Sequence, residues 1–325
     1  MSGAIWVLGE AVGDRLARAS AEVATLAASL GSTAGRDVVG VVAGASPDGP
    51  ASELAGYLPR VIGLTVPEAA DTAMAAAVSP SLAALIEREA PSFVLVAATQ
   101  DGRDIAGMLA ALLGWGVLVN ASAVGWAADG PSVEMSVFGG RLVTTSVFTA
   151  ERGIVTVRPN SVAAVEAPTR GSVEQVTVQP GRSLPVVRVL DRVEEESAAA
   201  PIEEARVIVA GGRGVGGPDG FRVVEDLAEA LGGAVGATRA AVDSGWIPYS
   251  QQIGQTGKIV KPELYLALGI SGAIQHKVGM QTASTIVAVN RDPDAPIAEF
   301  ADLVVIGDLF EVAPAIAAEL RSRTG

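Results

Sequence analysis

Residues 206–231 read RVIVAGGRGVGGPDGFRVVEDLAEAL. The apolar run Arg206–Ala210 is typical of a buried strand, Gly211–Gly217 of a tight turn, and Phe221–Leu231 carries an apolar stripe at helical spacing. Further short strands and a closing helix are predicted at Leu264–Leu268, Thr285–Val289, Leu303–Ile306 and Ala313–Leu320. Strands that alternate with helices predict a doubly wound parallel sheet, which binds ligands at the carboxyl ends of its strands.

The first half of the chain follows the same pattern. Its predicted strands are Ala4–Leu8, Asp37–Ala43 and Phe93–Ala98, and its predicted helices are Leu16–Leu30, Ser79–Glu89 and Asp104–Leu113. Alternating polar and apolar residues predict antiparallel strands added to this domain at Ser132–Phe138, Arg141–Thr149 and Gly153–Val157. The polar, acidic stretch 191–205 is interpreted as a linker. We therefore predict an α/β protein with an N-terminal domain at 1–190 and a C-terminal domain at 206–325.

Composition excludes several classes of function. The chain has 325 residues and a formal net charge of −13, which argues against nonspecific nucleic-acid binding. It has no cysteine and one histidine, His276, so thiolate catalysis and Cys- or His-rich metal sites are excluded, and we expect no metal. No apolar run is long enough to span a bilayer, and the N-terminus lacks the pattern of a signal peptide. We expect a cytoplasmic protein without membrane insertion.

The glycine cluster contains the spacing G-x-G-x-x-G at Gly212, Gly214 and Gly217. Such a loop between a strand and a helix can hold a phosphate through backbone N–H groups, although a plain tight turn gives the same pattern. Arg213 within it suits a diphosphate, or is a surface arginine. A nicotinamide-dependent oxidoreductase is one alternative, but the acidic residue expected about 20 residues later is missing.

Polar residues also follow the next strand. Thr238 and Arg239 place a hydroxyl and a permanent charge there, and a guanidinium stacks well on planar rings. The alternative is an Arg239–Asp243 pair on one helix face, at spacing i,i+4. The polar loop Gln251–Lys258 either contacts the edge of a heterocycle or is an ordinary turn.

Three more strand ends complete the pattern. Gly269–His276 reads GISGAIQH and places Ser271 and backbone amides where a helix begins, although a lone histidine is more often structural. Asn290 and Asp308 end the following strands and are able to hydrogen-bond adenine or hydroxyl groups. Several polar strand ends at one sheet edge predict one elongated ligand.

These segments resemble a known family. VGATRAAVDSGWIP (235–248), GQTGKIVKPELYLALGISGAIQH (254–276) and IVAVNRDPDAPIAEFADLVVIGDLFEVAP (286–314) are similar to the FAD domain of the electron transfer flavoprotein α subunit. AGGRG (210–214) fits the start of that domain. The first domain is similar more faintly, through FVLVAATQDGRDIAGMLAALLG (93–114) and GIVTVRPNS (153–161).

The resemblance implies a one-electron carrier, not a substrate-converting enzyme. It implies FAD in this chain, a heterodimer with an electron transfer flavoprotein β subunit, and AMP in that subunit. The implied donors are flavoprotein dehydrogenases such as the acyl-CoA dehydrogenases of fatty acid β-oxidation, and the implied acceptor is a membrane quinone oxidoreductase. An electron-bifurcating member of the family, or a regulatory protein with a degenerate nucleotide site, would also fit these residues.

The matching motifs imply the contacts of each part of FAD. The flavin is expected beside Arg213, Thr238 (in the place usually held by serine), Arg239, Ile253, Gly254, Gln255 and Thr256. The diphosphate and the O2 side of the ring are expected beside Ser271, Gly272, Ala273, Ile274, Gln275 and His276. The adenosine is expected beside Asn290, Asp308 and Leu309. Redox tuning is expected from the charge of Arg239, the Thr256 hydroxyl near N5, and His276 if its ring is protonated.

Overall fold

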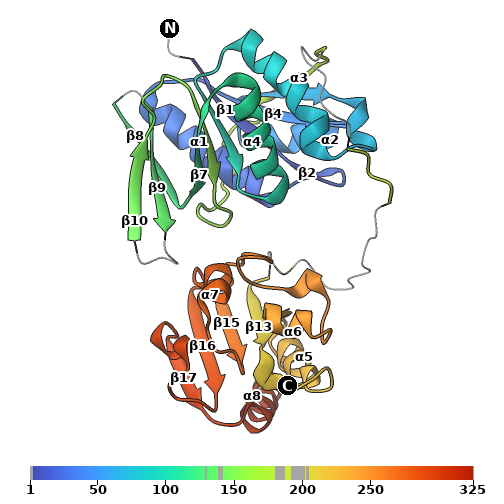
Figure 1. The fold of residues 1–325 in the computed structure, drawn as a ribbon, viewed down its shortest axis with the longest axis vertical. Coiled ribbons are helices and arrows are strands. Elements are labelled where there is room, and N and C mark those ends of the chain that lie inside the picture. The colour runs from blue at the N-terminus through green and yellow to red at the C-terminus, as the bar shows by residue number, and fades with distance from the viewer. Residues whose placement is uncertain are drawn as a thin grey trace. The chain divides into compact units, whose positions relative to one another are not determined.

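The computed structural model describes residues 3–128, 130–137, 142–179, 187–191, 202 and 205–324. The chain divides into two compact units, Met1–Arg192 and Val193–Gly325 (Figure 1). Each unit contains a parallel sheet with helices packed on it, which confirms the predicted two-domain α/β class. The predicted linker falls mostly outside the described residues, so its bounds stay a prediction. No helix in the described ranges is long and apolar enough to cross a membrane.

The N-terminal unit is built on a seven-stranded sheet in the order β12-β5-β4-β1-β6-β11-β7, with every neighbouring pair parallel. Its strands are β1 (Ile5–Gly9), β4 (Val38–Gly44), β5 (Arg60–Thr65), β6 (Phe93–Ala97), β7 (Gly116–Ala121), β11 (Gly153–Val157) and β12 (Ser172–Val176). A small ribbon pairs β2 (Ala11–Val12) with β3 (Arg15–Leu16). The helices are α1 (Arg18–Ala34), α2 (Asp48–Leu54), α3 (Met74–Glu89) and α4 (Gln100–Leu113). Every strand and helix predicted before residue 114 is present.

This sheet has an apolar core on each face. Successive side chains of a strand point to opposite faces. Ile5 and Val7 of β1 therefore pack with α1 and α2, whereas Trp6 and Leu8 pack with α3 and α4. All four side chains are almost completely buried. The sheet has helices on both faces and is therefore doubly wound, whereas the sequence predicted only its strand–helix units.

A separate antiparallel sheet consists of β8 (Ala123–Ala127), β9 (Gly130–Val137) and β10 (Leu142–Val147), seen beside the main sheet in Figure 1. It confirms the predicted antiparallel addition, although Phe138 and Arg141 lie outside the described residues. The prediction for the third segment is wrong, because β11 is a parallel strand between β6 and β7. All residues of β11 are buried. Its one polar side chain, Thr156, accepts a hydrogen bond from the Asn120 N–H at 2.8 Å inside the sheet and does not mark a solvent face.

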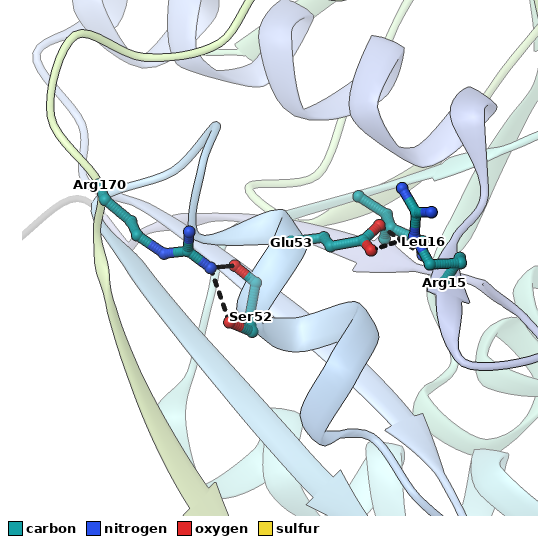
Figure 2. Close-up of polar contacts among 5 residues, drawn as sticks. All are labelled: Arg15, Leu16, Ser52, Glu53 and Arg170. Atoms are coloured by element: carbon teal, nitrogen blue, oxygen red, sulfur yellow. Dashed lines mark hydrogen bonds and ion pairs between the residues drawn. The ribbon is translucent and has the colours of Figure 1, made fainter.

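Helix α2 is tied to its neighbours by polar contacts, which Figure 2 shows. The carboxylate of Glu53 pairs with the Arg15 side chain and accepts a hydrogen bond from the Leu16 N–H at 3.0 Å. Arg170, from the segment before β12, donates to the carbonyl and the hydroxyl of Ser52, each at 2.6 Å. These contacts attach the β2–β3 ribbon and the segment before the edge strand to the helix layer.

The C-terminal unit contains a five-stranded parallel sheet in the order β14-β13-β15-β16-β17. Its strands are β13 (Val207–Gly211), β14 (Ala234–Ala237), β15 (Leu264–Leu268), β16 (Thr285–Asn290) and β17 (Leu303–Ile306). Its helices are α5 (Phe221–Ala230), α6 (Arg239–Asp243), α7 (Ile274–Met280) and α8 (Leu309–Thr324). Helices α5 and α8 pack on one face, and α7 packs on the other. The chain runs from β13 first to β14 and then back past β13 to β15, so the strand order reverses beside β13.

Candidate functional site

A cavity of about 630 Å³ opens at the carboxyl ends of the strands in the C-terminal unit. Its volume is typical of a small-molecule or cofactor pocket, and it lies where the strand order reverses. The predicted cofactor residues that line it are Arg213, Thr238, Arg239, Ser271, Gly272, Ala273, Gln275, His276 and Asn290. The predicted residues that do not line it are Ile253, Gly254, Gln255, Thr256, Ile274, Asp308 and Leu309.

Two glycine loops pack backbone against backbone beneath this cavity. The N–H of Gly214 donates to the carbonyl of Gly269 at 3.0 Å, and a Cβ on Gly212 would lie 2.4 Å from the same oxygen. The close approach of the two loops therefore requires glycine there. Helix α5 begins at Phe221 and not at Gly217, the third glycine of the motif. The loop does not open directly into a helix as in a dinucleotide-binding fingerprint, which disfavours the nicotinamide alternative.

Thr238 contributes an unpaired hydroxyl to the cavity wall. It stands between β14 and α6, and its N–H donates to the Gly211 carbonyl at 3.1 Å. Its Oγ1 is buried and has no hydrogen-bond partner in the described structure. Leaving a buried hydroxyl unpaired costs roughly 1–3 kcal/mol. A polar ligand atom in the cavity would supply the missing partner.

Two guanidinium groups border the cavity. Arg239, the first residue of α6, pairs with Asp243 at 3.1 Å, and the two side chains are 65% and 61% exposed. The helix-surface pair that the spacing predicted is therefore present. Because it is exposed, this pair holds the guanidinium weakly and leaves it able to turn toward an anionic ligand. Arg213 is exposed and forms no ion pair with the described residues.

The loop 253–258 lies against the helix that borders the cavity. The N–H of Gln255 donates to the carbonyl of Gln275 at 2.7 Å, and Gln275 lines the cavity. Thr256 is exposed, and its hydroxyl accepts a hydrogen bond from the amide of Gln252 at 3.1 Å. The loop is thus attached to the cavity wall by its backbone, and the contact of Thr256 with a flavin stays a prediction.

The single histidine is buried and neutral. Burial lowers the pKa of His276 from its ordinary value of 6.5 to about 4, against the opposing effect of a hydrogen bond to the Ile253 carbonyl. The Ile253 oxygen lies 3.0 Å from Nδ1, and the Tyr265 hydroxyl lies 2.8 Å from Nε2. The positive charge that a protonated His276 would supply is therefore absent from the described chain at pH 7. The fixed positive charges at the cavity belong to Arg213 and Arg239.

Asn290 joins two loops at the edge of the cavity. Its side-chain amide donates to the Ile270 carbonyl at 2.9 Å and accepts from the Asp292 N–H at 3.0 Å. Both partners line the cavity but were not predicted, although each lies just beyond the end of a strand, where ligand contacts concentrate. The cavity residues that the resemblance did not include among the FAD contacts are Gly212, Gly214, Ala240, Asp243, Gly269, Ile270, Asp292, Ala295 and Pro296. Of these, Gly212 and Gly214 belong to the glycine cluster that the sequence had indicated as a phosphate loop.

Asp308 and Leu309 lie at the start of α8, outside the cavity wall. The carboxylate of Asp308 accepts from the Phe310 N–H at 2.9 Å and pairs with Arg291, and these contacts, the hydrogen bond first, lower its pKa below 3.8. Leu309 is buried in the apolar core beneath α8. Their contact with adenosine stays a prediction. No three His, Asp or Glu side chains in the described ranges are grouped so as to hold a metal ion.

Two family models match this chain. The electron transfer flavoprotein domain matches residues 5–181, and the electron transfer flavoprotein FAD-binding domain matches residues 201–281. Together they cover most of both units. The chain belongs to the electron transfer flavoprotein α subunit family. The resemblance seen in the motifs is confirmed, and the C-terminal unit is the FAD-binding domain of this family.

Similar proteins are named electron transfer flavoprotein subunit alpha. That of Mycobacterium leprae is 46% identical over 321 residues, which is 98% of each chain. That of Bacillus subtilis is 39% identical over 290 residues, 88% of each chain. That of Paracoccus denitrificans is 38% identical over 323 residues, 98% of this chain and all of that protein. The similarity therefore extends through the N-terminal unit, where the motifs alone were faint.

The cavity residues fit FAD. The Thr238 hydroxyl lacks a hydrogen-bond partner. Gly272, with φ of 85°, has no side chain to cover the backbone at the cavity wall. The two guanidinium groups suit a diphosphate or a reduced flavin. FAD supplies the redox chemistry when it is bound. If FAD binds in this cavity, the guanidinium groups of Arg213 and Arg239, which line it, would lie beside the cofactor.

Replacing Thr238 by valine is expected to separate FAD binding from folding. Valine keeps the shape and removes the unpaired hydroxyl, so the free energy of unfolding of the cofactor-free chain should stay unchanged or rise by about 1 kcal/mol. If this hydroxyl hydrogen-bonds FAD, the affinity for FAD should fall about tenfold, which is about 1.4 kcal/mol. Urea unfolding and titration with FAD measure the two effects. A less stable chain with unchanged FAD affinity would show that the hydroxyl has a structural partner instead.

Proposed function

We propose that this chain is the FAD-holding subunit of a heterodimeric electron carrier. Its partner is an electron transfer flavoprotein β subunit, which holds AMP. The carrier takes electrons from flavoprotein dehydrogenases, such as the acyl-CoA dehydrogenases of fatty acid β-oxidation, and passes them to a membrane quinone oxidoreductase or a similar acceptor. Membership of the family supports the role of carrier. The donors, the acceptor, the partner and a cytoplasmic location rest on the resemblance of the motifs.

The observation that best supports this function is Arg239 beside the unpaired Thr238 hydroxyl on the cavity wall. The first electron that a bound flavin accepts adds a negative charge, whereas a second electron that is taken up together with a proton adds none. A permanent positive charge at contact distance favours that added charge by a few kcal/mol in a partly desolvated site. Arg239 keeps this charge at any physiological pH, whereas His276 is neutral.

Two features expected of a nicotinamide-dependent oxidoreductase are missing from the described residues of the C-terminal unit. The acidic residue that binds ribose in that class would follow the second strand of the unit, and Thr238 stands directly after β14. Acid–base chemistry would need an available group, and both ring nitrogens of His276 are hydrogen-bonded in the interior. An electron-bifurcating member of the family is distinguished by direct reduction of its flavin with NADH.

Arg239→Gln is expected to destabilise the one-electron-reduced state of the bound flavin by ~2 kcal/mol, a factor of more than ten. Arg239→Lys keeps the charge but loses the planar group, so its effect should be smaller. Stepwise anaerobic reduction of the complex with the β subunit, followed by its visible spectrum, gives the two one-electron midpoint potentials. The matched control is Arg222→Gln, since Arg222 is also an exposed arginine paired with an aspartate, Asp219 at 3.6 Å, but lies outside the cavity wall.

The proposal predicts a flavin spectrum in the wild type and a reduced separation of the two potentials only in the Arg239 variants. Equal midpoint potentials in Arg239→Gln and wild type would show that Arg239 has no electrostatic role at the flavin. A wild-type complex without bound flavin would favour a degenerate nucleotide site. Reduction by NADH would favour a bifurcating relative or a dehydrogenase.

A further inference from the structure

Tyr265 and His276 form a buried polar pair beside the cavity. Tyr265 in β15 is 0% exposed, and its hydroxyl lies 2.8 Å from Nε2 of His276 in α7. The Nδ1 atom of His276 lies 3.0 Å from the Ile253 carbonyl oxygen. This chain of contacts connects the centre of the sheet, the helix that borders the cavity and the first residue of the loop 253–258.

The partners of the ring determine its protonation. A carbonyl oxygen only accepts hydrogen bonds, so Nδ1 carries the hydrogen that is shared with Ile253. A neutral imidazole has one N–H, so Nε2 is bare and accepts the O–H of Tyr265. Burial keeps both groups in these states, because it lowers the pKa of His276 to about 4 and raises the pKa of Tyr265 well above 10. The opposite tautomer would set a lone pair on Nδ1 against the carbonyl oxygen.

We propose that Tyr265 is a positioning residue of the FAD site, which fixes the tautomer and orientation of His276 and, through it, the loop 253–258. The link to FAD rests on the proposed function. His276 lines the cavity, and its Nδ1–H holds Ile253, where the loop begins. Without the Tyr265 hydroxyl, the Ile253 carbonyl is the one remaining hydrogen-bond partner of this ring among the described residues.

The same hydroxyl controls what His276 can offer to a cofactor. The carbonyl groups of a flavin only accept, so a hydrogen bond from Nε2 to one of them requires a hydrogen on Nε2. In the wild-type arrangement that nitrogen receives the Tyr265 O–H instead. A flavin carbonyl that bound Nε2 would have to displace the Tyr265 hydroxyl, which a phenyl ring at this position would not resist. Tyr265 therefore keeps Nε2 an acceptor.

The test uses the fact that His276 is the single histidine of the chain. In the full-length chain labelled with ¹⁵N-histidine and free of FAD, long-range nitrogen–proton spectra report the protonation of each ring nitrogen. We expect a protonated Nδ1 and a bare Nε2 in the wild type. In Tyr265→Phe, the Nδ1–H tautomer loses one of its two hydrogen bonds, so its population should fall, while the Ile253 carbonyl still favours it. FAD affinity should fall about fivefold, the effect of losing one hydrogen bond of about 1 kcal/mol.

The matched control is Tyr249→Phe, because the Tyr249 hydroxyl holds the same loop, donating to the Thr256 carbonyl at 2.7 Å, but does not contact His276. It should leave the tautomer unchanged. A Tyr265→Phe chain with the wild-type tautomer and wild-type FAD affinity would overturn the proposal. A protonated Nε2 in the wild type would also overturn the proposal, and this measurement does not require the variant to fold. A wild type with the expected tautomer that binds no FAD would overturn the proposed function and leave the Tyr265–His276 assignment standing.

Discussion

Gly272→Ala is expected to lower the free energy of unfolding by about 2–5 kcal/mol and to abolish tight FAD binding. Gly272 lines the cavity with φ of 85°, in the left-handed region, which costs a residue with a Cβ roughly 1–2 kcal/mol. The added Cβ would lie 2.4 Å from the backbone nitrogen of Ile297, an overpacked contact worth about 1–3 kcal/mol. The clash is with a backbone atom, which cannot move away by changing rotamer as a side chain can. The Ser271 carbonyl, which accepts from Ile297 N–H at 3.0 Å, would have to move with it.

Urea unfolding of the cofactor-free chain and titration with FAD measure the two effects of Gly272→Ala. The matched control is Gly217→Ala, in the other glycine loop of the same unit, where an added Cβ meets nothing within 4 Å and φ is not positive. That variant should behave as wild type in both measurements. Wild-type FAD affinity in Gly272→Ala would mean that the loop after β15 does not form part of the FAD site.

The position of the cavity could be predicted from the sequence because it depends on topology. Parallel strands that alternate with helices place all their carboxyl ends at one edge of the sheet. Residues at or just after the carboxyl ends of β14, β15 and β16, such as Thr238, Ser271 and Asn290, therefore lie around one cavity. Local sequence pattern was enough to find them, because each follows directly on a short apolar run.

The side-chain contacts at the carboxyl ends of the strands could not be predicted from the sequence. Asp308 also ends a strand, but its carboxylate is taken up by Arg291 and by the Phe310 N–H, partners that only the folded chain brings together. The start of α8 at Leu309 was missed for a related reason. The predicted helix begins at Ala313, whereas Asp308 caps the helix earlier by accepting from the Phe310 N–H.

The wrong prediction that Gly153–Val157 is an antiparallel strand has the same cause, since its neighbours are known only from the fold. Apolar residues with one threonine, as in Gly153–Val157, fit either a half-exposed antiparallel strand or a strand buried on both faces. The partner of Thr156, the N–H of Asn120, lies on a neighbouring strand. No pattern within the segment identifies that partner. Periodicity was therefore informative about where strands occur and not about which strands become neighbours.

Glu10→Gln is expected to raise the free energy of unfolding by about 3 kcal/mol at pH 8 and to change it little at pH 4. Glu10 follows β1, and burial raises the pKa of its carboxyl from 4.5 to about 7. The Thr99 hydroxyl, 2.7 Å from each carboxylate oxygen, opposes this shift, and the charge of Asp101 adds to it. At pH 8 the folded chain therefore holds a partly buried negative charge that glutamine would remove.

The direction of the effect follows from proton binding. A carboxyl with a higher pKa in the folded chain binds its proton more tightly there than in the unfolded chain. Its contribution to stability is complete below about pH 4.5 and is lost as the pH rises to about 7. The difference between these values is about 2.5 pKa units, and at 1.36 kcal/mol per unit this is about 3 kcal/mol. Above pH 7 the loss is constant, because Glu10 is ionised in both states.

Urea unfolding of wild type and Glu10→Gln from pH 4 to pH 8 separates this effect from a change in packing. The difference in free energy of unfolding should be near zero at the acid end and grow through the interval between the two pKa values. Glu87→Gln, on an exposed carboxyl of α3, controls for loss of charge and should show no such growth. Thr99→Val removes the hydrogen bond that lowers the pKa of Glu10, so the loss of stability should extend to higher pH. An equal gain from Glu10→Gln at both pH values would show that the amide merely packs better, and that burial does not hold a proton on Glu10.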